Sequence, residues 1–119
     1  MFNDEIKNKV WEKGIIEEGY DSNVFRKDPC GAWIIKSEYG NQNSKFGWTI
    51  DHILPEALGG DDNLLNLRPM HWKNNIVKGD DYPIYKAVVQ SKSNDNIQVN
   101  IQFTINEKTQ ARIDELYKR

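Results

Sequence analysis

The hydrophobic positions near the start of the chain repeat with the period of a helix. Within residues 4–13, Ile6 and Val10 lie four positions apart, which is the spacing of a short amphipathic helix. Asn3 is a suitable N-cap residue, and Gly14 is a suitable residue to end the helix. The pattern therefore predicts a helix that begins after Asn3 and ends before Gly14.

Two short apolar runs follow within residues 32–50, on either side of a loop at 39–44 that is rich in glycine and asparagine. Such runs, separated by turn residues, predict two strands. Residues 51–70 then have the composition of a long loop, and a loop of this length in a small domain is more often functional than idle. Residues 71–78 suit a short helix that ends at Gly79.

The C-terminal part of the chain has a clear alternation. Its apolar members, which would share one face of a half-buried strand, are Ile97, Val99, Ile101 and Phe103. Residues 84–90 are predicted to pair with this strand. The sequence from Thr104 to Glu107 has the form of a capping box, which predicts a last helix. Together these elements predict an α+β fold in a single domain covering residues 1–119.

Composition excludes several classes of protein. With 119 residues, 38% of them hydrophobic, the chain can form one modest core. No apolar run approaches the ~20 residues that span a bilayer, so no membrane association is expected. Cys30 is the only cysteine, which excludes an internal disulfide and a zinc site built from cysteine pairs. Because the N-terminus also lacks the apolar stretch of a signal peptide, a cytoplasmic protein is expected.

The charges are nearly balanced, with 16 basic and 18 acidic residues and a net charge of −2. No segment forms a basic tail. Binding to nucleic acid would therefore depend on a local patch rather than on many phosphate contacts. The balance does not exclude a nuclease, because acidic metal ligands count as negative until the cation binds.

The residues with the most distinctive chemistry lie around the start of the long loop. Asp51 and His52 close the second predicted strand, where the carboxylate is suited to a hard cation and the imidazole to proton transfer. Asn75 lies in the following helix, and its amide oxygen could join Asp51 on a Mg²⁺-like ion. Asn66 lies between them, where its amide could fix the loop and the imidazole tautomer.

These residues occur in an order that resembles a known motif. The pattern runs Asp51-His52-Ile53-x-Pro55, then Gly59-Gly60, then Asn66-Leu67, then Asn75-x-x-Lys78. It resembles the HNH motif of the ββα-metal (His-Me finger) nucleases, with asparagine instead of histidine at the final position. Residues upstream of the motif resemble small prokaryotic or phage-type HNH proteins, so that the resemblance extends from about Val10 to Gly79.

The resemblance implies a ββα-metal HNH core at about 47–79, with a flanking helix and a C-terminal strand–helix extension at 82–119. It implies a metal-dependent endonuclease that hydrolyses DNA phosphodiester bonds and nicks one strand at a time. His52 would be the general base, with Asn66 and Asn75 as the other residues of the catalytic motif. One divalent cation, Mg²⁺ or Mn²⁺, would bind Asp51 and Asn75.

Many HNH proteins also hold their helix with two pairs of cysteines that bind zinc. Here His71 and Asn74 stand at the positions of the second pair, and there is no first pair. No structural zinc is therefore expected. Four basic side chains near the motif are candidates for contact with DNA, although a solvated surface charge is nearly as good an explanation for each; they are Arg26, His71, Lys73 and Lys78.

Two other functional classes remain open. One is a catalytically idle DNA-binding module with an HNH-like fold. The other is an interaction protein, in which the C-terminal strand and helix recruit this nuclease into a larger nuclease or phage assembly. A monomer that acts on double-stranded DNA is the default expectation.

Overall fold

The computed structural model describes all 119 residues and contains three α-helices and six strands. Their bounds are α1 (Asp4–Trp11), β1 (Phe25–Lys27), β2 (Trp33–Ile35), β3 (Trp48–His52), β4 (Leu67–His71), α2 (Trp72–Lys78), β5 (Ile84–Lys92), β6 (Asp95–Thr104) and α3 (Glu107–Tyr117). The strands form three antiparallel pairs, β1–β2, β3–β4 and β5–β6. The predicted α+β class is confirmed. None of the helices combines the length and the apolar character needed to cross a membrane.

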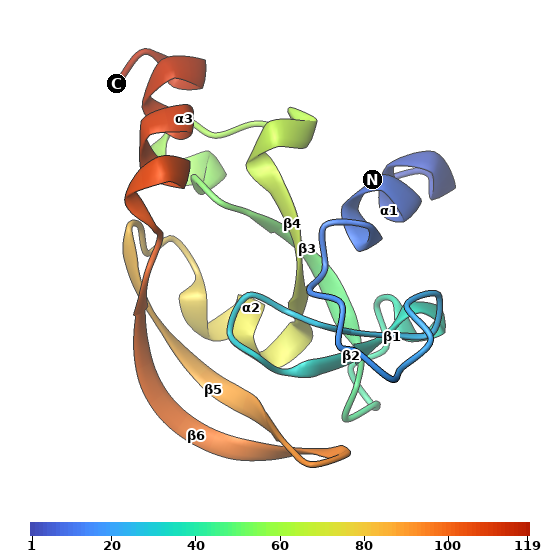
Figure 1. Cartoon of the computed structure of the whole chain (residues 1–119). Coiled ribbons are helices and arrows are strands. Elements are labelled where there is room, and N and C mark those ends of the chain that lie inside the picture. The colour runs from blue at the N-terminus through green and yellow to red at the C-terminus, as the bar shows by residue number, and fades with distance from the viewer.

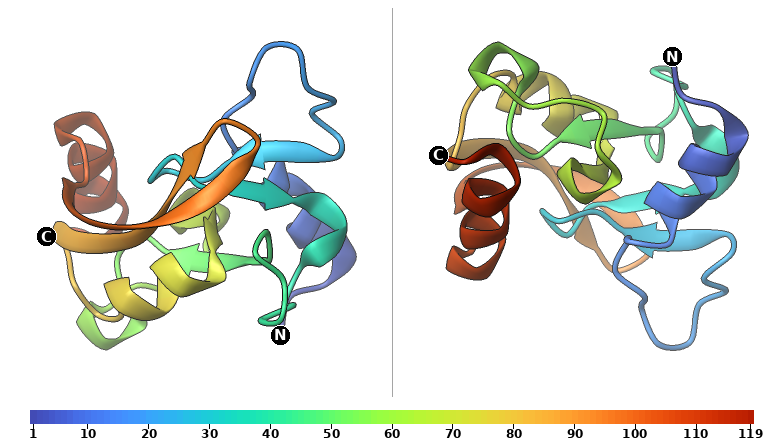
Figure 2. Two further views of the ribbon diagram at one scale, coloured as in Figure 1. Left: turned by 90° about the horizontal axis from the view of Figure 1, so that it is seen from below. Right: turned by 90° about the horizontal axis from the view of Figure 1, so that it is seen from above.

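The β3–β4 pair runs through the middle of the molecule, with α1 on one side and α2 on the other (Figure 1). The β5–β6 hairpin curves past α2 and reaches the β1–β2 pair (Figure 2), where Asn96 binds the backbone of Trp33. The helix α3 returns to the loop that joins β3 to β4 (Figure 1).

The apolar core is divided between the two faces of the β3–β4 pair. The cluster on the α1 side contains Val10, Trp11, Ile34, Trp48, Ile50 and Leu67. The cluster on the α2 side contains Cys30, Ile53, Leu54, Met70, Tyr85, Ala87, Ile105 and Ile113. Alternate residues of β3 and β4 therefore serve different cores, as the period of a strand requires.

The helix ends follow the predictions for the first two helices but not for the third. Asn3 caps α1 by accepting a hydrogen bond from Ile6 N, and Gly79 follows α2. The predicted capping box at Thr104 is wrong, because Thr104 is the last residue of β6. The cap of α3 is Asn106, whose side chain accepts from Thr109 N.

A bulge in β6 overturns the predicted alternation. Ala87 pairs with Ile101, whereas Val89 pairs with Gln98, so β6 has one more residue than β5 between these two pairs. The extra residue reverses the faces beyond it. Gln98 therefore shares a face with buried Val89, and Ile97 turns to the opposite face with 42% of its surface exposed.

Two buried polar side chains join the segments around α2. Asp28 accepts hydrogen bonds from Cys30 N and Ala32 N through one oxygen, and from His71 N and Asn74 Nδ2 through the other, at 2.8–3.1 Å. Burial raises the pKa of Asp28, and these four hydrogen bonds oppose the shift.

The second of these side chains, Asn74, continues the connection to β5. Its oxygen accepts from Val88 N at 2.8 Å and Val89 N at 2.9 Å, and its nitrogen donates to Val89 O at 3.0 Å. A side-chain amide is thus the hydrogen-bond partner of the β5 backbone where the strand pairing is irregular. Unsatisfied backbone groups in this interior would be costly.

Asn74→Ala is expected to lower the free energy of unfolding by about 2–4 kcal/mol, since it leaves several buried polar groups without a partner. Chemical denaturation followed by circular dichroism measures the change. The control is Asn100→Ala, an exposed amide on β6, for which a change within about 0.5 kcal/mol is expected. Equal stability of the two variants would contradict the role given to Asn74.

Candidate functional site

The imidazole of His52 lies at the exposed end of β3, beside two carboxylates from the loop that follows. Its Nε2 is 2.7 Å from Asp62 Oδ1, and its Nδ1 is 3.9 Å from Glu56 Oε1. The side chain of His52 is 18% exposed, whereas those of Asp62 and Glu56 are 67% and 71% exposed. The imidazole is therefore held by Asp62 at Nε2 and is only partly exposed at the molecular surface.

Asn66 closes the loop that carries these carboxylates. Its oxygen accepts from Leu54 N at 2.8 Å, while its nitrogen donates to Leu54 O at 3.1 Å and to Asp61 O at 3.0 Å. A Cβ added at Gly60 would lie 1.8 Å from Leu54 O, so only glycine allows this close approach. The amide fixes the residue before Asp62 and makes no contact with the imidazole.

The C-terminal helix α3 holds the same loop from outside. The hydroxyl of Tyr117 donates to Asp61 Oδ1 at 2.5 Å and accepts from Asp61 N at 3.2 Å. The first of these bonds is the main reason that the pKa of Asp61 lies below its usual value. Asp62 is thus preceded by a residue that is fixed by both Asn66 and Tyr117.

Asp51, which the sequence assigned to a metal, lies on the other face of β3 and is 2% exposed. Its Oδ2 is 2.8 Å from Arg68 Nε, and its Oδ1 is 3.2 Å from Lys78 Nζ. Lys78 also donates to the carbonyl oxygens of His52 and Ile53 at 3.0 and 3.3 Å. Burial lowers the pKa of Lys78, and the nearby Asp51 opposes this shift.

This environment does not suit a divalent cation at Asp51. One carboxylate already faces two positively charged groups, so a further cation would meet net repulsion. The predicted partner, Asn75, uses its nitrogen to bind Thr49 Oγ1 at 2.8 Å and Ile50 O at 3.3 Å. These contacts join Asn75 to the two residues of β3 before Asp51, and no hydrogen bond joins Asn75 to Asp51 itself.

Three of the four predicted DNA-binding side chains lie inside the protein. Arg26 is 7% exposed and donates to Ser22 O, Glu12 O and Gly14 O. His71 is 1% exposed, and Lys78 is 1% exposed in the ion pair described above. Only Lys73 is exposed, with its ammonium 5.3 Å from the centre of the Trp72 ring.

His71 has a structural task at the start of α2. Its Nδ1 accepts a hydrogen bond from Lys73 N at 3.1 Å, which makes it the N-cap of the helix, and its Nε2 is 2.7 Å from Lys45 O. The ring is therefore neutral, with its proton on Nε2. Burial lowers the pKa of His71 below its usual value of 6.5.

The donors best arranged for a metal are His52, Glu56 and Asp62, whose ligand atoms lie within 4.8 Å of one another. The sequence analysis missed the two carboxylates. The available signals were the position of Glu56 four residues after His52 and the acidic pair that follows Gly59 and Gly60.

Cys30 is buried beside Tyr85, and burial raises its pKa to about 12, so it stays a protonated thiol.

No family model, curated protein or solved structure matches this chain.

Asp51→Asn is expected to destabilise the metal-free protein by about 3–5 kcal/mol, because it leaves Arg68 and Lys78 buried without a counter-charge. Denaturation in the presence of EDTA measures this loss. Asp62→Asn, at an exposed carboxylate, should change stability by no more than about 0.5 kcal/mol. If Asp51→Asn were equally harmless, Asp51 would be a carboxylate available to a ligand rather than part of the fold.

The lowered pKa of His71 predicts a loss of stability in mild acid. Since the folded-state pKa lies below the unfolded value, the unfolded chain takes up the proton first. This contribution to stability is complete above pH 6.5 and is lost as the pH falls through the folded-state pKa. Urea denaturation at about pH 7.5 and about pH 5.5 measures it. His71→Asn keeps a capping side chain that does not titrate, so a smaller loss between the two pH values is expected.

Proposed function

We propose that this protein is a metal-dependent HNH endonuclease that hydrolyses DNA phosphodiester bonds and nicks one strand. The observation that carries the proposal is the position of His52. It stands at the exposed end of the first strand of a hairpin, β3–β4, which is followed at once by the helix α2, and its imidazole is held by Asp62. This strand–strand–helix order supports the proposal, because the motif implies a ββα arrangement.

The contacts of His52 support a role as general base. In the neutral ring, Nε2–H donates to Asp62 Oδ1, which leaves Nδ1 free to accept a proton. Nδ1 takes a proton from a water molecule as that water attacks the phosphorus atom. The bond from phosphorus to the 3′ oxygen breaks and the leaving oxygen takes a proton from solvent water, giving 5′-phosphate and 3′-hydroxyl ends. Asp62 is a positioning residue, and Asn66 acts on both through the loop.

The resemblance also implies one divalent cation, Mg²⁺ or Mn²⁺. Asp51 does not fit this task, because Arg68 and Lys78 already neutralise it. The donor set that fits consists of His52, Glu56 and Asp62, whose nitrogen and oxygen ligands suit Mn²⁺ and whose carboxylates suit Mg²⁺. A cation held there would supply positive charge to the scissile phosphate. In that state His52 would be a metal ligand and not a general base. Metal titration distinguishes these two roles.

One observation favours a second candidate, a catalytically idle HNH-like module that binds DNA. Asp51, which the motif assigns to metal binding, is already paired with Arg68 and Lys78. We propose the active enzyme as the better explanation, because His52 keeps a partly exposed imidazole with a carboxylate partner. The working form in this proposal is a cytoplasmic monomer on double-stranded DNA, alone or within a larger assembly.

Incubation with supercoiled plasmid and a series of divalent metals tests the proposal. Nicking should require Mg²⁺ or Mn²⁺ and stop with EDTA. His52→Ala is expected to lower the rate roughly 10²–10⁴-fold, and Asp62→Asn roughly 10–100-fold, as for other groups that orient a histidine. Asp80→Asn, an exposed carboxylate on the turn after α2, is the control and should keep full activity.

The metal dependence of each variant decides how His52 acts. Unchanged metal affinity in His52→Ala, with a slower rate, identifies a base. Weaker metal binding in both His52→Ala and Asp62→Asn identifies ligands. A wild-type protein that never nicks DNA but binds it would support the idle module instead.

A further inference from the structure

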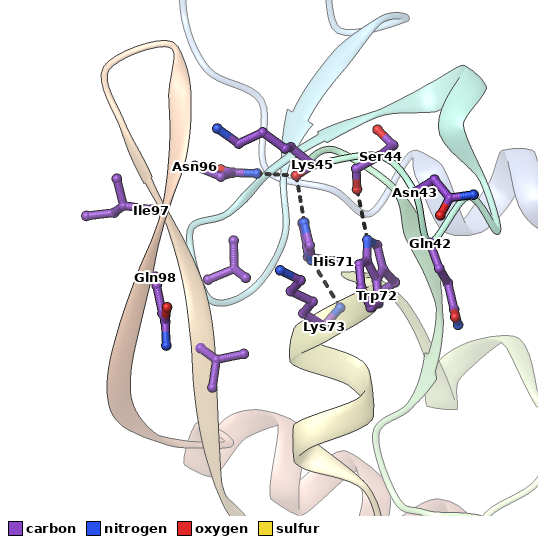
Figure 3. Close-up of a pocket in the computed structure, with 12 residues that line it drawn as sticks. Gln42, Asn43, Ser44, Lys45, His71, Trp72, Lys73, Asn96, Ile97 and Gln98 are labelled. Atoms are coloured by element: carbon purple, nitrogen blue, oxygen red, sulfur yellow. Dashed lines mark hydrogen bonds between the residues drawn. The ribbon is translucent and has the colours of Figure 1, made fainter.

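A concave surface lies at the opposite end of the β3–β4 pair from His52. It is a groove of about 680 Å³ between the β5–β6 hairpin and the start of α2. Figure 3 shows Ile97 and Gln98 on one wall, Asn43 and Trp72 on the other, and Lys73 between them. The volume lies within the range of pockets that hold small ligands, roughly 300–1,000 Å³.

The base of the groove is rigid and its polar groups are satisfied. Asn96 is 7% exposed and binds Trp33 N, Trp33 O and Lys45 O. His71 shares the same carbonyl of Lys45, and Trp72 Nε1 donates to Ser44 O. These contacts join three separate segments, so the groove is formed before any ligand binds.

The side chains on the walls, by contrast, are uncommitted. Those of Gln42, Asn43 and Gln98 form no hydrogen bond within the protein, and each amide offers both a donor and an acceptor. The ammonium of Lys73 has no carboxylate partner and lies over the Trp72 ring. Lys45, the other cation of the groove, is paired with Asp95 at 2.7 Å. The groove thus offers one free cation and several amides above the apolar side chains of Val88 and Val89.

This combination suits a nucleotide better than a bare phosphate. Amide side chains read the hydrogen-bonding edges of bases, and a lysine contacts the backbone phosphate. A base enters a concave pocket only when it is unpaired, since a paired base is stacked inside the duplex. The near-balanced charge of the chain points the same way, because affinity cannot come mainly from phosphate contacts.

The spacing along the hairpin relates the groove to His52. His71 pairs with Trp48, and His52 pairs with Leu67, so the two ends are four residues apart on each strand. At ~3.4 Å per residue this is about 14 Å, or roughly four nucleotides of a stacked strand at ~3.4 Å each. The two places also lie on opposite faces of the hairpin, because the ring of His52 lies on the α1 side near Phe2 and the groove lies on the α2 side. A strand bound at both would therefore have to pass around the edge of the hairpin.

We propose that this groove binds an unpaired nucleotide of the nucleic-acid strand that the protein acts on, through Asn43, Lys73 and Gln98. The proposal rests on the proposed nuclease function for its substrate class. It makes a duplex with a bulged or unpaired nucleotide the preferred substrate. The strand can be DNA or RNA, because the groove residues contact the base and the phosphate rather than the sugar.

Binding is measured with EDTA present, so that no cleavage interferes, by the fluorescence anisotropy of labelled oligonucleotides. The probes are a fully paired DNA duplex, the same duplex with one bulged nucleotide, and the matching RNA forms. The bulged duplex should bind more tightly than the paired one. Asn43→Ala and Gln98→Ala should each weaken binding to the bulged probe roughly fivefold, the value of one hydrogen bond.

Matched controls lie on the same elements. Gln102→Ala changes an exposed amide of β6 outside the groove, and Lys86→Ala removes an exposed lysine of β5; both should bind as the wild type does. Binding of the bulged probe should also quench tryptophan emission, and Trp72→Phe should remove that quenching. Comparison of the DNA probes with the RNA probes shows which of the two nucleic acids the groove prefers.

Equal affinity for paired and bulged probes, or wild-type binding by Asn43→Ala and Gln98→Ala, would overturn the proposal. The nuclease proposal stands or falls separately. If plasmid is nicked while these variants bind normally, the groove is not a nucleotide site. If the bulged probe binds as expected while no metal supports cleavage, the groove binds nucleic acid in a protein that is not a nuclease.

Discussion

The carboxylate of Asp51 lies between the guanidinium of Arg68 and the ammonium of Lys78, in the interior where β3, β4 and α2 meet. Because charged groups are costly to bury alone, each of these elements can occupy its place only when the other two are present. Lys78 also binds the carbonyl oxygens of His52 and Ile53. The same group of charges therefore sets the position of the backbone from which the side chain of His52 projects.

Polar side chains of α2 complete this framework. Asn74 binds Asp28 and the backbone of β5, Asn75 binds β3, and Lys78 binds Asp51. One short helix is thus fixed to three different segments through directional contacts. Such contacts specify orientation more strictly than apolar packing does. His52 therefore lies on the face of the β3–β4 hairpin away from α2. The groove of Figure 3 lies beside the start of α2.

The sequence predicted the elements that depend on neighbouring residues. It did not predict the contacts between residues that are far apart in the chain. Helix periodicity and capping located α1 and α2, and the HNH-like motif singled out His52 and Asn66. Arg26 and Lys78 are residue types that usually lie on the surface. Only the folded structure shows that backbone carbonyls bind Arg26 in the interior and that the carboxylate of Asp51 binds Lys78 there. Asp62 was missed for the same reason, since its approach to His52 depends on loop closure by Asn66. The bulge in β6 leaves no trace in an alternating sequence.

The contact between Tyr117 and Asp61 has a consequence for the order of folding. These residues are 56 positions apart, whereas the β3–β4 hairpin and α2 are formed by neighbouring segments. Contacts between distant residues carry the larger entropic cost of loop closure and form late. As the chain leaves the ribosome, the hairpin and helix can assemble while the loop beside His52 still lacks its outer anchor. The loop beside His52 therefore reaches its final form last, after α3 has been synthesised and has docked.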